Sequence, residues 1–214
     1  MPSARERLCR ACLYLVTDAG ISDAALRAAL AGGVDMVQLR DPSLDDDGIL
    51  EAAARFREAC ETRDALLWIN DRPDLALRAG ADGVHVGQDD VPVGHIRDDL
   101  GDELLIGLST HSVDQLEAGI ATGADQLSVG PVWETPTKPG RPAAGLGFVE
   151  AAAALAPPVP WFAIGGIDAG NVAEVAAAGA RRIVVVRAIW DAEDPAAAAE
   201  ALLAGLEVRV GAAQ

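Results

Sequence analysis

The chain has 214 residues, of which 50% are hydrophobic, 23% charged and 4% aromatic. This length and apolar content argue against disorder and favour a single domain over residues 1–214 with a substantial core. The formal net charge of −16 argues against a nucleic-acid partner, because a nucleic-acid binder needs a basic face to replace the counterions on phosphates.

The sequence also disfavours a membrane protein and a disulfide-stabilised protein. No apolar run reaches the ~18 residues of a transmembrane helix, so no membrane partner is expected. The 3 cysteines are an odd number and do not make a disulfide framework in a chain of this length. We therefore expect a reducing, cytoplasmic location.

Eight short apolar runs predict buried β-strands. They are nearly continuous in apolar residues, as expected for parallel strands that are covered on both faces. The predicted strands are Leu13–Thr17, Met36–Arg40, Leu66–Asn70, Gly83–Val86, Leu105–Leu108, Gln126–Val129, Trp161–Ile164 and Ile183–Val186.

Segments rich in alanine and leucine lie between these strands and have helical spacing. Ser22, Asp45 and Ser112 are suited to cap the N-termini of three of them, and glycines follow several of the C-termini. The predicted helices are Ala24–Ala31, Asp47–Glu61, Pro73–Ala79, Val93–Leu100, Val113–Thr122, Leu146–Leu155, Asn171–Ala178 and Pro195–Leu206.

A phrase of helix end, glycine, polar residue and buried strand recurs along the chain, for example at 79–88 and 122–131. Eight strand–helix units predict an α/β fold, a single (β/α)8 TIM barrel, whose active site lies at the C-terminal ends of the strands. An open doubly wound sheet with fewer strands is the alternative.

Two carboxylates, Asp71 and Asp90, follow neighbouring predicted strands, so both can face one point at the barrel mouth. Two carboxylate oxygens with waters and a diphosphate make an ordinary Mg²⁺ shell. Alternatively, Asp71 caps the helix that begins near Pro73 and Asp90 caps the helix near Val93. Both readings stay open at this point.

Two later segments suit an anionic ligand. Lys138 is the only lysine of the chain, and it follows the hydroxyls of Thr135 and Thr137 in a long loop rich in proline. Gly165 and Gly166 end a predicted strand in the manner of barrels that bind phosphate through backbone N–H groups.

Six phrases in order carry a family pattern. They are Leu13-Tyr-Leu-Val-Thr-Asp, Val37-Gln-Leu-Arg, Ile69-Asn-Asp-Arg with Ala81-Asp-Gly-Val-His-Val-Gly-Gln-Asp-Asp, Ile106-Gly-Leu-Ser-Thr-His, Gly130-Pro-Val-Trp-Glu-Thr-Pro-Thr-Lys and Ala163-Ile-Gly-Gly-Ile. Through them the chain resembles the thiamine phosphate synthase family over nearly its whole length. The resemblance implies a (β/α)8 barrel that joins an aminopyrimidine diphosphate to thiazole phosphate, or its carboxylate, by loss of diphosphate before the thiazole nitrogen attacks.

The resemblance also implies site residues. Those implied for the pyrimidine diphosphate are Gln38, Arg40, Asn70, Ser109 and Lys138, with Arg40, Ser109 and Lys138 catalytic. Those implied for thiazole phosphate are Thr135, Thr137, Gly166, Val186 and Arg187. Asp71 and Asp90 would bind Mg²⁺, the implied cofactor.

Two positions depart from the family pattern. Pro42 stands where the family usually has a lysine, and Arg187 stands where it usually has a serine. Arg187 either supplies a replacement charge from across the mouth or points away while its backbone binds phosphate.

Three other functions remain as alternatives, and the sequence leaves the oligomeric state open. The first is a thiazole tautomerase-like relative that uses His111 as acid or base. The second is a barrel that binds a phosphate ligand without turnover. The third is a phosphosugar enzyme with Asp18 as base.

Overall fold

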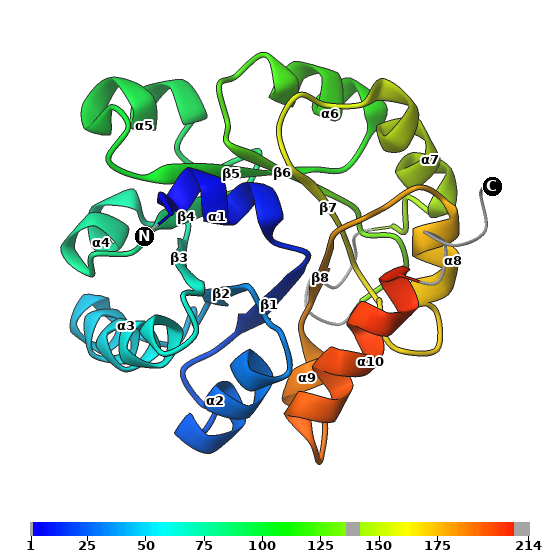
Figure 1. Cartoon of the computed structure of the whole chain (residues 1–214). Helices are drawn as coiled ribbons and strands as arrows, with labels where there is room; N and C mark the ends of the chain where they lie inside the picture. The colour runs from blue at the N-terminus through cyan, green and yellow to red at the C-terminus, as the bar shows by residue number, and fades with distance from the viewer. Residues whose placement is uncertain (1, 136–141, 208–214) are drawn as a thin grey trace.

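The structure is a computed structural model that describes residues 2–135 and 142–207. Eight parallel strands form a closed barrel in chain order, with helices around its outside (Figure 1). The barrel closes at β1 (Leu13–Thr17), which pairs with β2 (Met36–Leu39) on one side and β8 (Ile183–Val185) on the other. The predicted (β/α)8 barrel is confirmed, and the open sheet is excluded.

The remaining strands are β3 (Leu66–Asn70), β4 (Gly83–Val86), β5 (Leu105–Thr110), β6 (Gln126–Val129) and β7 (Trp161–Ile164). The largest difference from the predicted bounds is in β5, which continues for two residues beyond Leu108. Ser109 and Thr110 are polar, but they are buried inside the barrel wall, where Thr110 Oγ1 donates to the Ser128 carbonyl at 2.9 Å. An apolar pattern alone ends the strand too early here.

The predicted helices are present with ends shifted by at most two residues. They are α2 (Asp23–Ala31), α3 (Asp46–Glu61), α4 (Pro73–Arg78), α5 (Val93–Leu100), α6 (Val113–Ile120), α7 (Leu146–Leu155), α8 (Val172–Ala177) and α10 (Pro195–Glu207). The predicted caps Ser22, Asp45 and Ser112 each accept a hydrogen bond from a backbone N–H in the first turn. Among the helices of the described residues, none is both long and apolar enough to cross a membrane.

Two helices were not predicted. The first, α1 (Ala4–Arg10), begins at a capping box in which Ser3 and Glu6 bond each other's backbone N–H groups. It lies across the ring of strands in Figure 1, and its Leu8 packs with side chains of the barrel interior. The second, α9 (Arg187–Trp190), has only four residues, too few for a periodic pattern.

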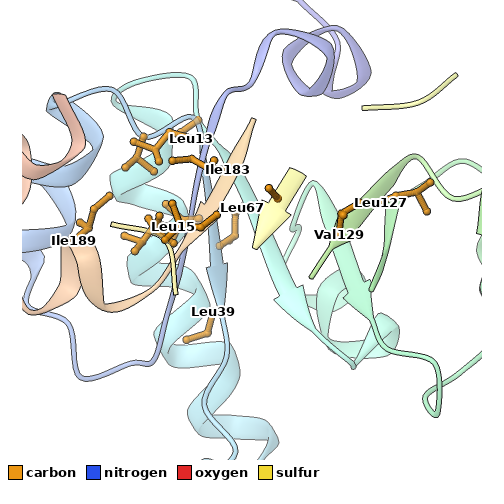
Figure 2. Close-up of a cluster of buried hydrophobic side chains, with 14 of the residues drawn as sticks. Leu13, Leu15, Leu39, Leu67, Leu127, Val129, Ile183 and Ile189 are labelled. Carbon is orange, nitrogen blue, oxygen red and sulfur yellow. The ribbon is translucent and has the colours of Figure 1, made fainter. Parts of the chain in front are cut away.

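Buried apolar side chains form two layers on either side of the barrel wall. Leu15 and Leu67 point outward against the helices, as Figure 2 shows for part of this outer layer. Tyr14, Trp68 and Phe162 point into the barrel, where their aromatic rings pack against one another. This alternation follows from the two-residue period of a strand. The inner face also carries polar side chains, and these lie together at one end of the barrel.

The recurring phrase has a structural role, because its aspartates join neighbouring strands. Asp82, before β4, accepts from the backbone N–H of Leu67 on β3 at 2.8 Å. Asp125, before β6, accepts from the N–H of Ile106 on β5 at 2.9 Å. Arg97 also donates to the Asp125 carboxylate at 2.8 Å, and Arg5 of α1 contacts its other oxygen. These buried carboxylates tie the N-terminal end of the barrel together.

We expect Asp125→Ala to lower the free energy of unfolding by about 3–5 kcal/mol, since it removes the buried carboxylate that accepts from a buried N–H and from two guanidinium groups. Urea denaturation measures this loss. Asp102→Ala is the matched control, because Asp102 approaches Arg5 and Arg97 at 3.7 and 3.3 Å but its side chain is 86% exposed. The control should change stability by less than about 1 kcal/mol. Equal losses in both variants would contradict the role of burial.

Candidate active site

A cavity of about 350 Å³ opens at the C-terminal end of the barrel, where the sequence placed the active site. All eight strands or the loops after them contribute to its lining. Eight of the predicted site residues lie together in this lining: Gln38, Arg40, Asn70, Ser109, Thr135, Gly166, Val186 and Arg187. The predicted residues Thr137 and Lys138 lie outside the described residues.

Tyr14 and Gln38 form one side of the cavity floor. Gln38 Nε2 donates to the Tyr14 hydroxyl oxygen at 2.5 Å, and both side chains are buried. Burial raises the pKa of Tyr14, so the phenol stays neutral. This bond fixes the orientation of the Gln38 amide before any ligand arrives. Tyr14 was not among the predicted site residues, because an inward-facing aromatic residue of a strand has the same sequence pattern as a core residue.

Two serines, on β5 and β6, form another part of the floor. His85 Nε2 lies 2.9 Å from Ser109 Oγ, and Gln126 Nε2 donates to Ser128 Oγ at 3.0 Å. Neither His85 nor Ser128 was among the predicted site residues. The register of β5 and β6 brings Ser109 and Ser128 side by side, and this register cannot be read from the sequence.

Two positive side chains line the cavity. Arg40 follows β2 and Arg187 follows β8, so they lie on either side of β1. Within the described part of the chain, neither takes part in an ion pair, whereas Arg57 and Arg97 pair with Asp82 and Asp125. In a chain with a net charge of −16, guanidinium groups left without a carboxylate at a cavity are suited to hold an anionic ligand.

A glycine turn after β7 forms the wall beside Arg187. Gly165 and Gly166 have φ values of +107° and +69°, which side chains rarely adopt. A Cβ at Gly166 would also lie 2.8 Å from Trp133 Cβ, so the loops after β6 and β7 pack closely. Asn171 Nδ2 donates to the Gly166 carbonyl at 2.8 Å and holds the turn in place. Such a turn brings backbone N–H groups close to a bound anion.

The residues that line this cavity do not include the predicted metal ligands, Asp71 and Asp90. Asp71 follows β3 directly after Asn70, whose Nδ2 donates to Asp71 Oδ2 at 2.5 Å. Asp90 lies in the loop after β4, where Gln88 Nε2 donates to the Ser109 carbonyl at 2.6 Å. Asp71 thus contacts a cavity residue directly, and Asp90 belongs to a loop that is hydrogen-bonded to one.

The capping alternative for these aspartates is not what the structure shows. The N-caps of α4 and α5 are Arg72 and Pro92, and neither helix has a side-chain cap. Asp90 Oδ2 accepts instead from the backbone N–H of Gly87 at 2.8 Å. Asp71 adopts a φ of +58°, an uncommon conformation for a residue other than glycine, and such residues are frequent at functional sites.

Arg72 holds the segment beside Asp71. Its guanidinium pairs with Asp46 at the start of α3 and with Asp74 in α4, each at 2.7 Å. The hydrogen bonds from Arg72 lower the pKa of both carboxyls, so both remain charged near neutral pH. Arg72 therefore fixes the loop after β3 to the helices α3 and α4, while Asp71 contacts Asn70.

The donor set fits a hard divalent cation. Asp71 and Asp90 supply carboxylate oxygens from adjacent loops, and a neighbouring N–H donor orients each of them, as is common for metal-binding carboxylates. No group of three or more His, Cys, Asp or Glu side chains is placed to hold a metal among the residues that the structure describes. Two carboxylates are sufficient for Mg²⁺ when waters and phosphate oxygens complete its shell.

Comparisons with known proteins agree with this geometry. The family model described as "Thiamine monophosphate synthase" matches residues 13–189. The thiamine-phosphate synthase of Thermobifida fusca (strain YX) is 55% identical over 203 residues, covering 92% of this chain and 93% of that protein. The thiamine-phosphate synthase of Acidothermus cellulolyticus is 53% identical over 207 residues, covering 94% and 98%.

Solved structures give the same result. The thiamine phosphate pyrophosphorylase from Pyrococcus furiosus has a TM-score of 0.86 and 31% identity, covering 97% of this chain and 99% of that chain. A 3-hexulose-6-phosphate synthase, at a TM-score of 0.68 and 23% identity, shares the fold alone. With the matching family model and relatives above 50% identity, this chain belongs to the thiamine monophosphate synthase family and is a transferase of thiamine biosynthesis.

Proposed function

We propose that the chain condenses an aminopyrimidine diphosphate with thiazole phosphate, or with its carboxylate, to give thiamine phosphate and diphosphate. The observation that carries the proposal is a cavity with a polar floor and two guanidinium groups, those of Arg40 and Arg187, that have no ion pair within the described residues. Such a cavity suits a flat, polar ring that carries negative groups.

In this proposal one side of the cavity holds the pyrimidine diphosphate. Gln38, Asn70 and Ser109 line that side and supply hydrogen-bonding groups, and Arg40 lies beside them after β2. Lys138, which comes from the family motif, adds a second cation. Asp71 and Asp90 would hold Mg²⁺, which when bound neutralises charge on diphosphate oxygens.

The proposed reaction needs no protein nucleophile. The bond between the methylene carbon and the diphosphate oxygen breaks, and the electron pair leaves with the diphosphate. The thiazole nitrogen then forms the new bond to that carbon. Arg40 and Lys138 neutralise the negative charge that develops on the leaving group, which is the largest contribution that a preorganised site makes to such a reaction.

The other side of the cavity is assigned to thiazole phosphate. Gly166, Val186 and Arg187 belong to the loops after β7 and β8, and Thr135 belongs to the neighbouring loop after β6. In the proposal the backbone N–H groups of the first three and the hydroxyls of Thr135 and Thr137 bind the phosphate oxygens. The two substrates thus lie with their reacting atoms near the centre of the barrel mouth.

The direct test is an incubation of the purified protein with both substrates and Mg²⁺, followed by measurement of thiamine phosphate. We expect formation of product that depends on both substrates. Tight binding of thiazole phosphate with no product, in protein of native circular dichroism, would instead assign the barrel to ligand binding without turnover.

One observation favours a second candidate, proton transfer on the thiazole. His111 lines the cavity, and its Nδ1 lies 2.6 Å from the Gly130 carbonyl oxygen. A carbonyl only accepts, so this contact places a proton on Nδ1 and makes Nε2 the basic nitrogen. In the same incubation without the pyrimidine substrate, isomerisation of the thiazole would identify this activity.

Arg187→Ser tests the role of the residue that departs from the family pattern. We expect the KM for thiazole phosphate to rise about tenfold with a smaller change in kcat, because one charge-assisted contact to the phosphate is lost. Steady-state kinetics measure both constants. Arg181→Ser is the matched control, because Arg181 precedes β8 at the opposite end of the same strand. Unchanged kinetics in Arg187→Ser would reject a role for its side chain.

A further inference from the structure

The two serines of the cavity floor are each held by a buried polar side chain. Ser109 and Ser128 are register partners on β5 and β6. His85 contacts Ser109 Oγ, and Gln126 donates to Ser128 Oγ. His85 is only 7% exposed and Gln126 is completely buried, so the protein rather than solvent sets the direction of these bonds.

Gly107 is the position at which these two side chains meet. It is the register partner of His85 on one side and of Gln126 on the other. A Cβ on residue 107 would lie closer than 3.0 Å to both His85 Nδ1 and Gln126 Oε1. The two atoms therefore share the space that a side chain at this position needs. Close approach of its neighbours is what requires glycine here.

The arrangement favours one tautomer of His85. Gln126 uses its amide nitrogen on Ser128, so its carbonyl oxygen is the atom that shares the space over Gly107 with His85 Nδ1. Within the part of the chain that the structure describes, the buried Gln126 carbonyl oxygen accepts no hydrogen bond, so it acts on Nδ1 through its partial negative charge. A negative oxygen at this place favours a proton on Nδ1 and a lone pair on Nε2. In this tautomer the Ser109 hydroxyl donates to His85 Nε2 across 2.9 Å. The lone pairs of Ser109 Oγ then face the cavity.

We infer that Gln126 and Gly107 are positioning residues, which hold His85 in the Nδ1–H tautomer and make Ser109 Oγ a hydrogen-bond acceptor toward the bound substrate. An acceptor at this point recognises a substrate with an N–H donor. In the proposed reaction that donor is the amino group of the pyrimidine. The identity of the donor rests on the proposed function, whereas the tautomer rests only on the packing of the floor.

Gln126→Met tests the inference, since it keeps the length of the side chain and removes the carbonyl. Nitrogen-15 NMR of the imidazoles reports the tautomer, and the chain has only 3 histidines to assign. We expect the Nδ1–H form of His85 in the unmodified protein and a mixture of both tautomers in Gln126→Met. The KM for the pyrimidine diphosphate should rise about tenfold while the KM for thiazole phosphate stays unchanged.

Leu127→Met is the matched control, because Leu127 is the next residue of β6 and points outward into the other buried layer. It should leave both the tautomer and the KM values unchanged. A Gly107→Ala variant, which forces His85 and Gln126 apart, should reproduce the change in KM for the pyrimidine diphosphate.

The outcomes separate this inference from the proposed function. An Nε2–H tautomer of His85 in the unmodified protein overturns the inference, even where a variant fails to fold. An unaltered tautomer in folded Gln126→Met, or equal rises in both KM values, also overturns it. If the unmodified protein forms no thiamine phosphate, the proposed function fails, and the NMR result still decides the tautomer.

Discussion

Asp71→Asn is expected to lower kcat/KM at least about a hundredfold at fixed Mg²⁺, and EDTA is expected to stop product formation in the unmodified protein. The substitution removes the negative charge with little change in structure. Asparagine tolerates the φ of +58° found at this position, and its side-chain oxygen still accepts from Asn70 Nδ2. The loss is therefore attributable to a weaker hold on the cation and the diphosphate.

Two measurements make this result specific. The Mg²⁺ concentration for half-maximal rate should rise in Asp71→Asn and in Asp90→Asn, and excess Mg²⁺ should recover part of the rate. Asp89→Asn, a charge change at the exposed neighbour of Asp90, should have little effect. Product formation that continues in EDTA would remove the metal from the proposal, whatever the variants show.

The strands were predictable because most of this barrel is locally encoded. The strand Gly83–Val86 and the helix Val93–Leu100 lie where the pattern predicted them. The first is a short run with apolar residues, the second has apolar residues at helical spacing, and turn residues bound both. The errors occur where tertiary structure decides. Thr110 continues β5 because the neighbouring strand β6 provides an acceptor for its hydroxyl, the Ser128 carbonyl. The helix α1 was missed although Ser3 and Glu6 spell a capping box in the sequence.

The cavity walls were predictable from the ends of the strands, whereas the contacts within its floor were not. Residues such as Arg40 and Gly166 follow the ends of strands, and a parallel barrel brings all such ends together. The floor depends on register and closure. Tyr14 reaches Gln38 because β1 and β2 are neighbours, and Gln126 reaches Ser128 along the inner face of one strand. Gln38 was predicted from a family phrase, but nothing in the linear sequence separates Tyr14, Gln126 and Ser128 from ordinary core positions.

Arg40→Gln is expected to lower kcat about a hundredfold, because a cation next to the leaving group is more valuable as charge develops than in the bound ground state. Arg40→Lys should recover part of this loss, since it restores the charge but not the planar fork that bonds two oxygens. Single-turnover kinetics isolate the bond-breaking step from product release. A change confined to KM would place Arg40 in binding alone.

The control for Arg40 distinguishes local neutralisation from long-range attraction. Arg27→Gln alters the net charge by the same unit, but Arg27 pairs with Glu58 at 2.8 Å on the outer helices, and both side chains are largely exposed. With a net charge of −16, the whole molecule repels a diphosphate at long range, and this repulsion is screened by salt. If attraction at a distance governed the rate, both variants would lose activity and the loss would shrink as salt is added. If charge at the cavity governs it, Arg27→Gln stays active and the loss in Arg40→Gln persists at high salt.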